Sequence, residues 1–254
     1  MRPASALPVA RLTVARCVQR DLDQGRWADA ETRLVGARQA GQMLPGAERL
    51  PWLALVLRFE AARRVDVGPW PALVEVALPD EDALPWVGPL VRGVAAARSS
   101  WARQDAALHA RGRAEAVRLE RLAAAAGPVS EAERARLLVQ AALAGAQYER
   151  EEMQLLLEAA HELEGRLLTG DELRAPVVLA RELEADLLLL TDRYAEAGQR
   201  YRELLAQWPR RVHARIGLAA AYRRLGHARE AAETLSQVRA LWASADPAAL
   251  ARIE

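Results

Sequence analysis

Two ten-residue segments of the chain repeat one pattern at a distance of 34 residues. Residues 192–201 read DRYAEAGQRY and residues 226–235 read GHAREAAETL. In each segment a turn residue is followed five places later by alanine, and four places after that by a large apolar residue. Small side chains let two helices cross closely, and large ones fill the space beside the crossing. The spacing therefore predicts pairs of antiparallel helices that stack as repeated units.

The N-terminal third of the chain carries related signals. Residues 25–34, GRWADAETRL, repeat the same pattern, and the dipeptide Pro-Trp occurs three times, beginning at Pro51, Pro69 and Pro85. Proline is tolerated in the first turn of a helix, where its missing N–H would have no intrahelical partner. We therefore expect each of these prolines to begin a helix, and each indole to pack between neighbouring units.

Composition points to helices throughout. Alanine, leucine, arginine and glutamate dominate, and no segment alternates between apolar and polar residues as a half-buried strand would. Two S/T-x-x-E motifs, Ser130 with Glu133 and Thr169 with Glu172, have the spacing of a capping box at a helix start. Residues 101–126 keep helical spacing and are expected to form one long helix. The predicted fold class is all-α.

The residues from Val178 to Trp242 resemble two consecutive tetratricopeptide repeats. The matching positions are Ala185, Leu188, Ala197, Tyr201, Leu204 and Pro209 in the first unit, and Leu218, Ala219, Tyr222, Gly226, Ala231, Leu235 and Val238 in the second. The resemblance implies a right-handed α-α superhelical solenoid of about six helical hairpins, as in bacterial tetratricopeptide adaptors and regulators. Asp246 and Pro247 are expected to start a further helix that caps the stack.

The strength of the repeat signal divides the chain into three parts. Residues 1–98 are expected to form N-terminal hairpins like tetratricopeptide repeats, residues 99–170 divergent helical hairpins, and residues 171–254 the C-terminal repeat pair with a partial capping helix.

The resemblance also places a ligand groove on the first helices of the two C-terminal units. The implied groove residues are Leu179, Glu182, Asp186, Leu189, Leu190, His213, Ile216, Ala220, Arg223 and Arg224. Arg223 and Arg224 could clamp a carboxylate of a partner, because guanidinium groups bind carboxylates bidentately. Residues 149–197 contain thirteen acidic residues and five arginines, whereas residues 198–240 contain nine arginines and three glutamates. The alternative is that Arg223 and Arg224 simply pair with the acidic segment before them.

Several other functions lack their signatures. The chain has no lysine, so a GxxxxGK[ST] phosphate-binding loop is impossible, and neither GxGxxG nor HExxH occurs. The net charge is only +1, and a strip of arginines between Arg98 and Arg121 is interrupted by acidic residues, so a solvated helix face is favoured over a nucleic-acid track. We expect no cofactor, no metal and no nucleic acid. Uncharged runs are far shorter than the roughly 20 residues that span a bilayer, and we expect a cytoplasmic protein.

The favoured interpretation is a non-enzymatic scaffold that binds a peptide or protein segment in the concave groove of its repeats. A second hypothesis is a sensory or regulatory module of a bacterial transcriptional activator or kinase system. A third is an enzyme whose site uses carboxylates one helical turn apart, such as Glu182 and Asp186. The sequence does not identify the partner or the oligomeric state.

Overall fold

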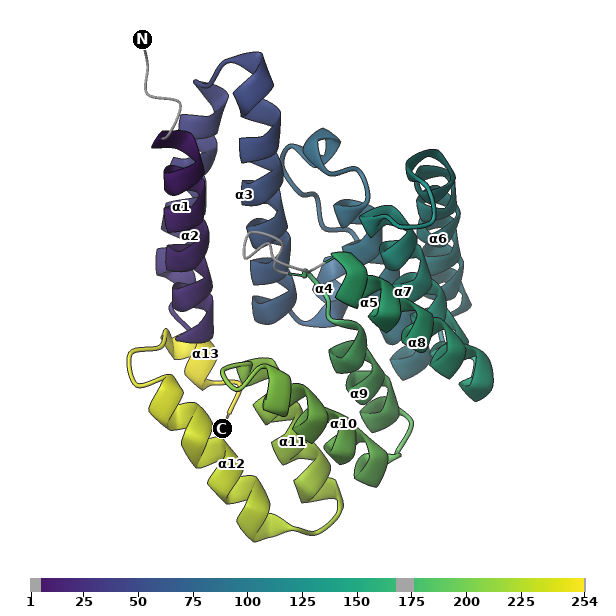
Figure 1. The fold of residues 1–254 in the computed structure, drawn as a ribbon. Coiled ribbons are helices and arrows are strands. Elements are labelled where there is room, and N and C mark those ends of the chain that lie inside the picture. The colour runs from purple at the N-terminus through teal and green to yellow at the C-terminus, as the bar shows by residue number, and fades with distance from the viewer. Residues whose placement is uncertain (1–5, 168–175, 254) are drawn as a thin grey trace.

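A computed structural model of the chain describes residues 6–167 and 176–253, and within these ranges it contains helices and no strand (Figure 1). The helices of the first two thirds are α1 (Ala6–Asp23), α2 (Trp27–Gln42), α3 (Gly46–Val67), α4 (Trp70–Leu73), the 3-10 helix η1 (Glu81–Ala83), α5 (Val87–Arg103), α6 (Ala106–Ala126), α7 (Glu131–Ala146) and α8 (Arg150–Leu167). The remaining helices are α9 (Ala180–Leu190), α10 (Tyr194–Gln207), α11 (Val212–Arg224), α12 (Ala228–Leu241) and α13 (Pro247–Leu250).

The helices stack as a solenoid of helical hairpins, which confirms the predicted fold class. Each of α1, α5, α7, α9 and α11 is followed by a partner helix that packs against it. After α3 comes only the four-residue α4, which packs mainly against α5, so five full hairpins and one incomplete hairpin precede α13. Every odd-numbered helix in this series also packs against the next odd-numbered helix. The odd helices therefore form one layer, and α2, α6, α8, α10 and α12 each pack beside the odd helix that precedes them (Figure 1).

Polar side chains at two helix starts explain where the middle hairpins begin. The Ser130 hydroxyl accepts a hydrogen bond from the Glu133 N–H at 3.2 Å, which confirms the predicted cap of α7. The prediction of one helix over residues 101–126 is wrong. Gln104 adopts a left-handed conformation, and the Asp105 carboxylate accepts hydrogen bonds from two N–H groups of the next turn, so α5 ends and α6 begins here. The predicted capping box at 169–172 lies outside the described residues.

The three Pro-Trp dipeptides do not all mark helix starts. Pro69 directly precedes α4, and Pro85 lies two residues before α5, but Pro51 lies inside α3. The helix starts earlier than predicted because Pro45 is its N-cap and the residues between the two prolines are compatible with helix. The predicted packing role of the indoles is confirmed for Trp52 and Trp86, which are both buried.

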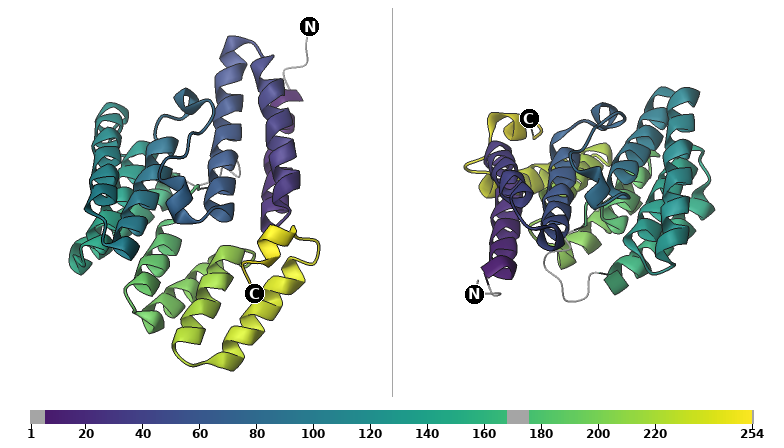
Figure 2. Two further views of the ribbon diagram at one scale, coloured as in Figure 1. Left: turned by 180° about the vertical axis from the view of Figure 1, so that it is seen from behind. Right: turned by 90° about the horizontal axis from the view of Figure 1, so that it is seen from above.

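The first and last hairpins of the described chain pack against each other, so the solenoid closes on itself. One hydrophobic core runs from α3 to α11, and a second core combines residues of α1 to α3 with residues of α11 to α13. Trp27 of α2 and Trp242 after α12 meet edge to face with ring centroids 5.9 Å apart. Figures 1 and 2 show α13 against the end of the α1–α2 hairpin. The helix predicted as a cap therefore joins the two ends.

Hydrogen bonds fix this closure at the turn between α1 and α2. Arg26, the N-cap residue of α2, provides no side-chain cap. The Asp246 carboxylate takes over that role by accepting a hydrogen bond from the Ala28 N–H at 2.8 Å, and the Asp246 N–H donates to the Gly25 carbonyl at 3.0 Å. Gly25 has a φ of +67°, and a Cβ atom there would lie 2.8 Å from that of Ala245. Glycine therefore suits both the turn and the close contact.

Candidate binding site

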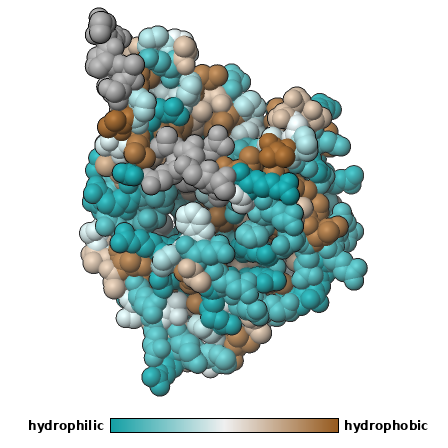
Figure 3. Space-filling model, in the orientation of Figure 1, coloured by the Kyte–Doolittle hydropathy of each residue, from teal (hydrophilic) through white to brown (hydrophobic). Residues whose placement is uncertain are grey.

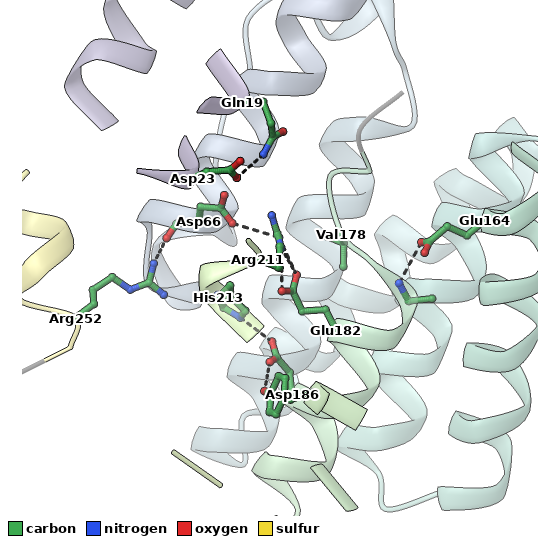
Figure 4. Close-up of polar contacts among 12 residues, drawn as sticks. Gln19, Asp23, Asp66, Glu164, Val178, Glu182, Asp186, Arg211, His213 and Arg252 are labelled. Carbon is green, nitrogen blue, oxygen red and sulfur yellow. Dashed lines mark hydrogen bonds and ion pairs between the residues drawn. The ribbon is translucent and has the colours of Figure 1, made fainter. Parts of the chain in front are cut away.

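The predicted groove residues lie on α9 and α11, apart from Leu179, which is the N-cap of α9, and the structure divides them into a closed half and an open half. Glu182 and Asp186 are buried, and the largely buried His213 lies beside them (Figure 4). The closed half also contains Leu179, which is buried, and Ile216, which packs against the second core. The open half, at the C-terminal ends of the two helices, contains Leu189, Leu190, Ala220, Arg223 and Arg224.

In the closed half, Asp186 is surrounded by donors from three other helices. Its carboxylate accepts hydrogen bonds from Arg98 of α5 at 2.6 Å and from the Tyr201 hydroxyl of α10, and it contacts His213 Nε2 of α11 at 3.3 Å. Because Arg98 comes from α5, this cluster ties the C-terminal repeats to the middle of the solenoid. The Arg98 guanidinium also lies 4.6 Å above the ring of Trp70.

Arg211, just before α11, makes a second link across the interior. Its guanidinium forms a bidentate contact with the Glu182 carboxylate, with Nη2 2.7 Å from Oε2 and Nε 2.9 Å from Oε1. The same Nη2 lies 3.4 Å from the carboxylate of Asp66, near the end of α3. Glu182 is thus occupied by the chain itself, and α9 and α11 are bound to the N-terminal half (Figure 4).

In this interior network, each charged side chain favours the ionised form of its partner, which offsets the cost of burying the charges. Burial alone would disfavour ionised Asp186, but Arg98, His213 and the Tyr201 hydroxyl outweigh it and hold the pKa of its carboxyl far below the ordinary value. Burial likewise opposes protonation of His213, yet the Asp186 and Glu182 carboxylates raise the pKa of its imidazole above the ordinary value. The network is a set of paired structural charges.

Comparison with known protein families gives a match for the segment that contains the open-half residues. Residues 188–251 match the family model of the tetratricopeptide repeat. The chain is therefore similar to this family over these residues, which we call the tetratricopeptide region. No curated protein and no solved structure matches the chain. Tetratricopeptide repeats generally mediate protein–protein interactions, and the family is typically a non-enzymatic scaffold.

Within the tetratricopeptide region, the arginines differ in their partners. Arg200 and Arg211 pair with Glu184 and Glu182 of α9. The alternative that Arg223 and Arg224 pair with the acidic segment before them is not found among the described residues. Arg223 and Arg224 are exposed at the end of α11, and neither forms an ion pair with any residue between 6–167 or 176–253. Arg224 lies above the ring of Tyr194, with its Cζ atom 5.8 Å from the ring centroid.

Sequence reasoning missed the residues that fill the closed half from outside the tetratricopeptide region. Arg98 and Asp66 lie far from α9 in the sequence, and no local pattern connects them with Glu182 or Asp186. An indirect signal existed, because charged residues at inward-facing positions of α9 require partners of opposite charge. Among the described residues, no group of three or more His, Cys, Asp and Glu is placed to hold a metal ion. None of the described helices has the length and apolarity needed to cross a membrane.

Proposed function

We propose that this protein is a non-enzymatic scaffold that binds a peptide or protein segment at the open half of its tetratricopeptide groove. The observation that carries the proposal is the exposed pair Arg223 and Arg224, which has no ion-pair partner among the described residues although the rest of the groove is internally paired. Guanidinium groups bind carboxylates through two parallel hydrogen bonds, so the complementary partner carries an acidic side chain or a free carboxylate.

The neighbouring surface suits a partner bound through polar contacts with a small apolar part. Leu189, Leu190 and Ala220 lie in the C-terminal parts of α9 and α11, are partly exposed and offer apolar area. Large exposed apolar residues elsewhere, such as Met43 and Leu155, are scattered over different helices. Figure 3 shows a largely hydrophilic face with separate hydrophobic patches. Charge complementarity at the arginine pair, rather than a broad apolar interface, would therefore select the partner.

The test compares two double charge reversals in the full chain. Arg223→Glu with Arg224→Glu changes the proposed site, and Arg229→Glu with Arg239→Glu makes the same change of charge on α12. Each hydrogen-bonded charge pair that a partner covers contributes about 1.5–3 kcal/mol, so losing both should weaken binding at least about tenfold. Partners are captured from an extract of the source organism with each variant and quantified by mass spectrometry.

The expected result is that one or more proteins bind the wild type and the α12 variant but are lost with the Arg223 and Arg224 variant. Circular dichroism and urea unfolding of both variants check that the helices remain folded. Equal capture by all three proteins would contradict the proposed site. Loss with both variants alike would indicate a general effect of charge, and the arginine pair would then have no specific role.

A further inference from the structure

A cleft large enough for a ligand lies where two turns of the solenoid meet. It has a volume of about 410 Å³, which falls within the roughly 300–1,000 Å³ of ordinary ligand sites. Its walls come from the end of α5, the start of α6 and the end of α7, so it is separate from the groove on α9 and α11. The largest side chains in these walls are Trp101 and Tyr148, whose ring centroids are 6.4 Å apart with the ring planes tilted by 57°.

Tyr148 occupies a backbone position that suits glycine. It lies two residues beyond the end of α7 with a φ of +61°, and the corresponding residues after α1, α9 and α11 are Gly25, Asp192 and Gly226, which also have positive φ. This left-handed conformation is free for glycine and common for aspartate, but it is unfavourable for a bulky side chain. Tyr148 is 71% exposed, so burial does not offset this cost. An exposed aromatic ring on such a backbone indicates contact with a partner.

Trp101 contributes a hydrogen-bond donor that the folded chain leaves unused. Its indole nitrogen is buried and has no hydrogen-bond partner among the described residues, although the side chain as a whole is partly exposed. A buried N–H without an acceptor is costly, and it calls for an acceptor that the chain does not supply. Gln104, Gln147 and Tyr148 line the same cleft and are exposed, and exposed side chains change rotamer within nanoseconds, so they can move aside for an entering group. The occupant should therefore carry an acceptor.

Two other kinds of occupant fit the cleft less well. A flat aromatic molecule stacks between two rings only when these are parallel and about 7 Å apart, twice the contact distance between carbon atoms. Trp101 and Tyr148 are tilted and closer than this. A quaternary ammonium ion would find aromatic rings but has no acceptor for the indole N–H, and the Asp105 carboxylate already accepts hydrogen bonds from two N–H groups of α6. The cleft therefore favours a saturated group with a carbonyl beside it.

We propose that this cleft binds a proline-rich segment of a partner in the polyproline II conformation. Proline has a saturated ring that packs on aromatic faces, and it has no backbone N–H that burial would leave unpaired. The polyproline II backbone makes no internal hydrogen bonds, so its carbonyl groups are free to accept from the Trp101 indole and from the amides of Gln104 and Gln147. Such a segment is also ordered before it binds, which lowers the entropy cost of binding.

The cleft lies on the same edge of the solenoid as the arginine pair at the end of α11. Arg150, two residues after Tyr148, lies 3.6 Å from the Glu196 carboxylate in the first turn of α10, and Arg224 lies above the ring of Tyr194 at the start of the same helix. Figure 1 shows the turns after α7, α9 and α11 along one edge. This arrangement favours an extended chain segment over an isolated small molecule. The inference goes beyond the proposed scaffold function, because a neutral proline-rich segment has no carboxylate side chain for the arginine pair.

The probe is decaproline with blocked ends, and a blocked Gly-Ser decapeptide is its control. Binding to the full chain is measured by calorimetry and by the NMR signal of the Trp101 indole N–H, which is assigned by its loss in Trp101→Phe. We expect decaproline to bind with a Kd below about 1 mM and to shift this signal downfield, as a new hydrogen bond would, and the control peptide to do neither.

Trp101→Phe keeps an aromatic ring and removes the donor. Because one neutral hydrogen bond is lost, this variant should bind decaproline about two- to tenfold more weakly than the wild type in calorimetry. The matched control is Trp208→Phe, which makes the same change at an exposed tryptophan after α10 and should leave the affinity unchanged. Equal affinity of all three proteins would overturn the role of the indole N–H.

Tyr148→Gly separates recognition from folding. Glycine relieves the left-handed backbone and removes an exposed ring, so the urea midpoint of this variant should be at least as high as that of the wild type. The variant should nevertheless lose saturable binding of decaproline. A lower urea midpoint with unchanged binding would assign the ring of Tyr148 to the fold alone and overturn the proposal.

Two further outcomes would overturn the proposal as a whole. One is that decaproline does not bind the wild type at millimolar concentration. The other is that tetramethylammonium binds and shifts the Trp101 signal while decaproline does not, because the cleft would then be a site for cations. The double variant Arg223→Glu with Arg224→Glu should bind decaproline like the wild type, so the proline site and the proposed scaffold site can fail independently.

Discussion

Gly217→Ala should destabilise the protein although the residue lies in the middle of a helix. Gly217 of α11 faces Tyr201, and a Cβ atom there would lie 2.2 Å from Cζ of the tyrosine ring. Tyr201 is fully buried and donates its hydroxyl hydrogen bond to Asp186, so the ring cannot move without breaking that bond. The 34-residue pattern places a large side chain at 201, and glycine at 217 provides the space for it.

The expected magnitude follows from three contributions. Overpacking a buried contact costs about 1–3 kcal/mol. Losing the hydrogen bond to the Asp186 carboxylate costs about 1.5–3 kcal/mol. Replacing a helical glycine by alanine returns about 1 kcal/mol. The free energy of unfolding should therefore fall by about 1.5–5 kcal/mol, a large part of the stability of an ordinary domain.

The assay is urea unfolding followed by circular dichroism, with Gly36→Ala as the matched control. Gly36 lies inside α2, and a Cβ atom there would meet nothing within 4 Å. The same substitution should therefore stabilise the protein at this position by about 0.5–1 kcal/mol. If Gly217→Ala were as stable as the wild type, the close packing of Tyr201 against α11 would be refuted.

Two other perturbations test the caps and the interior charges. Asp105→Ala removes the acceptor of the Ala107 and Leu108 N–H groups and should lower the free energy of unfolding by about 0.5–2 kcal/mol, measured in urea, with a smaller loss for Asp105→Asn. The raised pKa of His213 means that its pairing with Asp186 stabilises the fold fully below pH 6.5 and progressively less as the pH rises through the folded-state pKa. In the wild type the urea midpoint should therefore decline as the pH rises above about 6.5, and His213→Gln should flatten this decline. If the decline were unchanged in the variant, another group would be responsible for it.

Local features of the fold could be predicted from the sequence because they depend on neighbouring residues. The alanines at 197 and 231 are buried at helix crossings, as the repeated pattern predicted. The Ser130 cap requires only a residue three places away. The break between α5 and α6 was not predicted, although Asp105 is an ordinary N-cap residue. The helical periodicity of the sequence continues on both sides of Asp105 and gives no sign of the break. Strong periodicity shows that helices are present, but not where one ends and the next begins.

The closure and the interior charge network could not be predicted in the same way. A hydrophobic period shows which face of a helix is buried, and it does not show which helix covers that face. Asp246 caps a helix that begins 219 residues earlier in the chain, and Arg98 reaches Asp186 across 88 residues. Such pairings depend on the curvature that accumulates over six hairpins. A small change in the angle at any hairpin would bring different residues together.

Closure changes how this solenoid can work as a binding protein. In an open stack each repeat contacts only its neighbours, and the whole concave surface is available to ligands. Here the second core joins the first and last hairpins, and the Glu182–Arg211–Asp66 and Arg98–Asp186 contacts fill the interior. The surface of the groove that we propose for recognition is therefore its open half, where Arg223 and Arg224 have no ion-pair partner among the described residues.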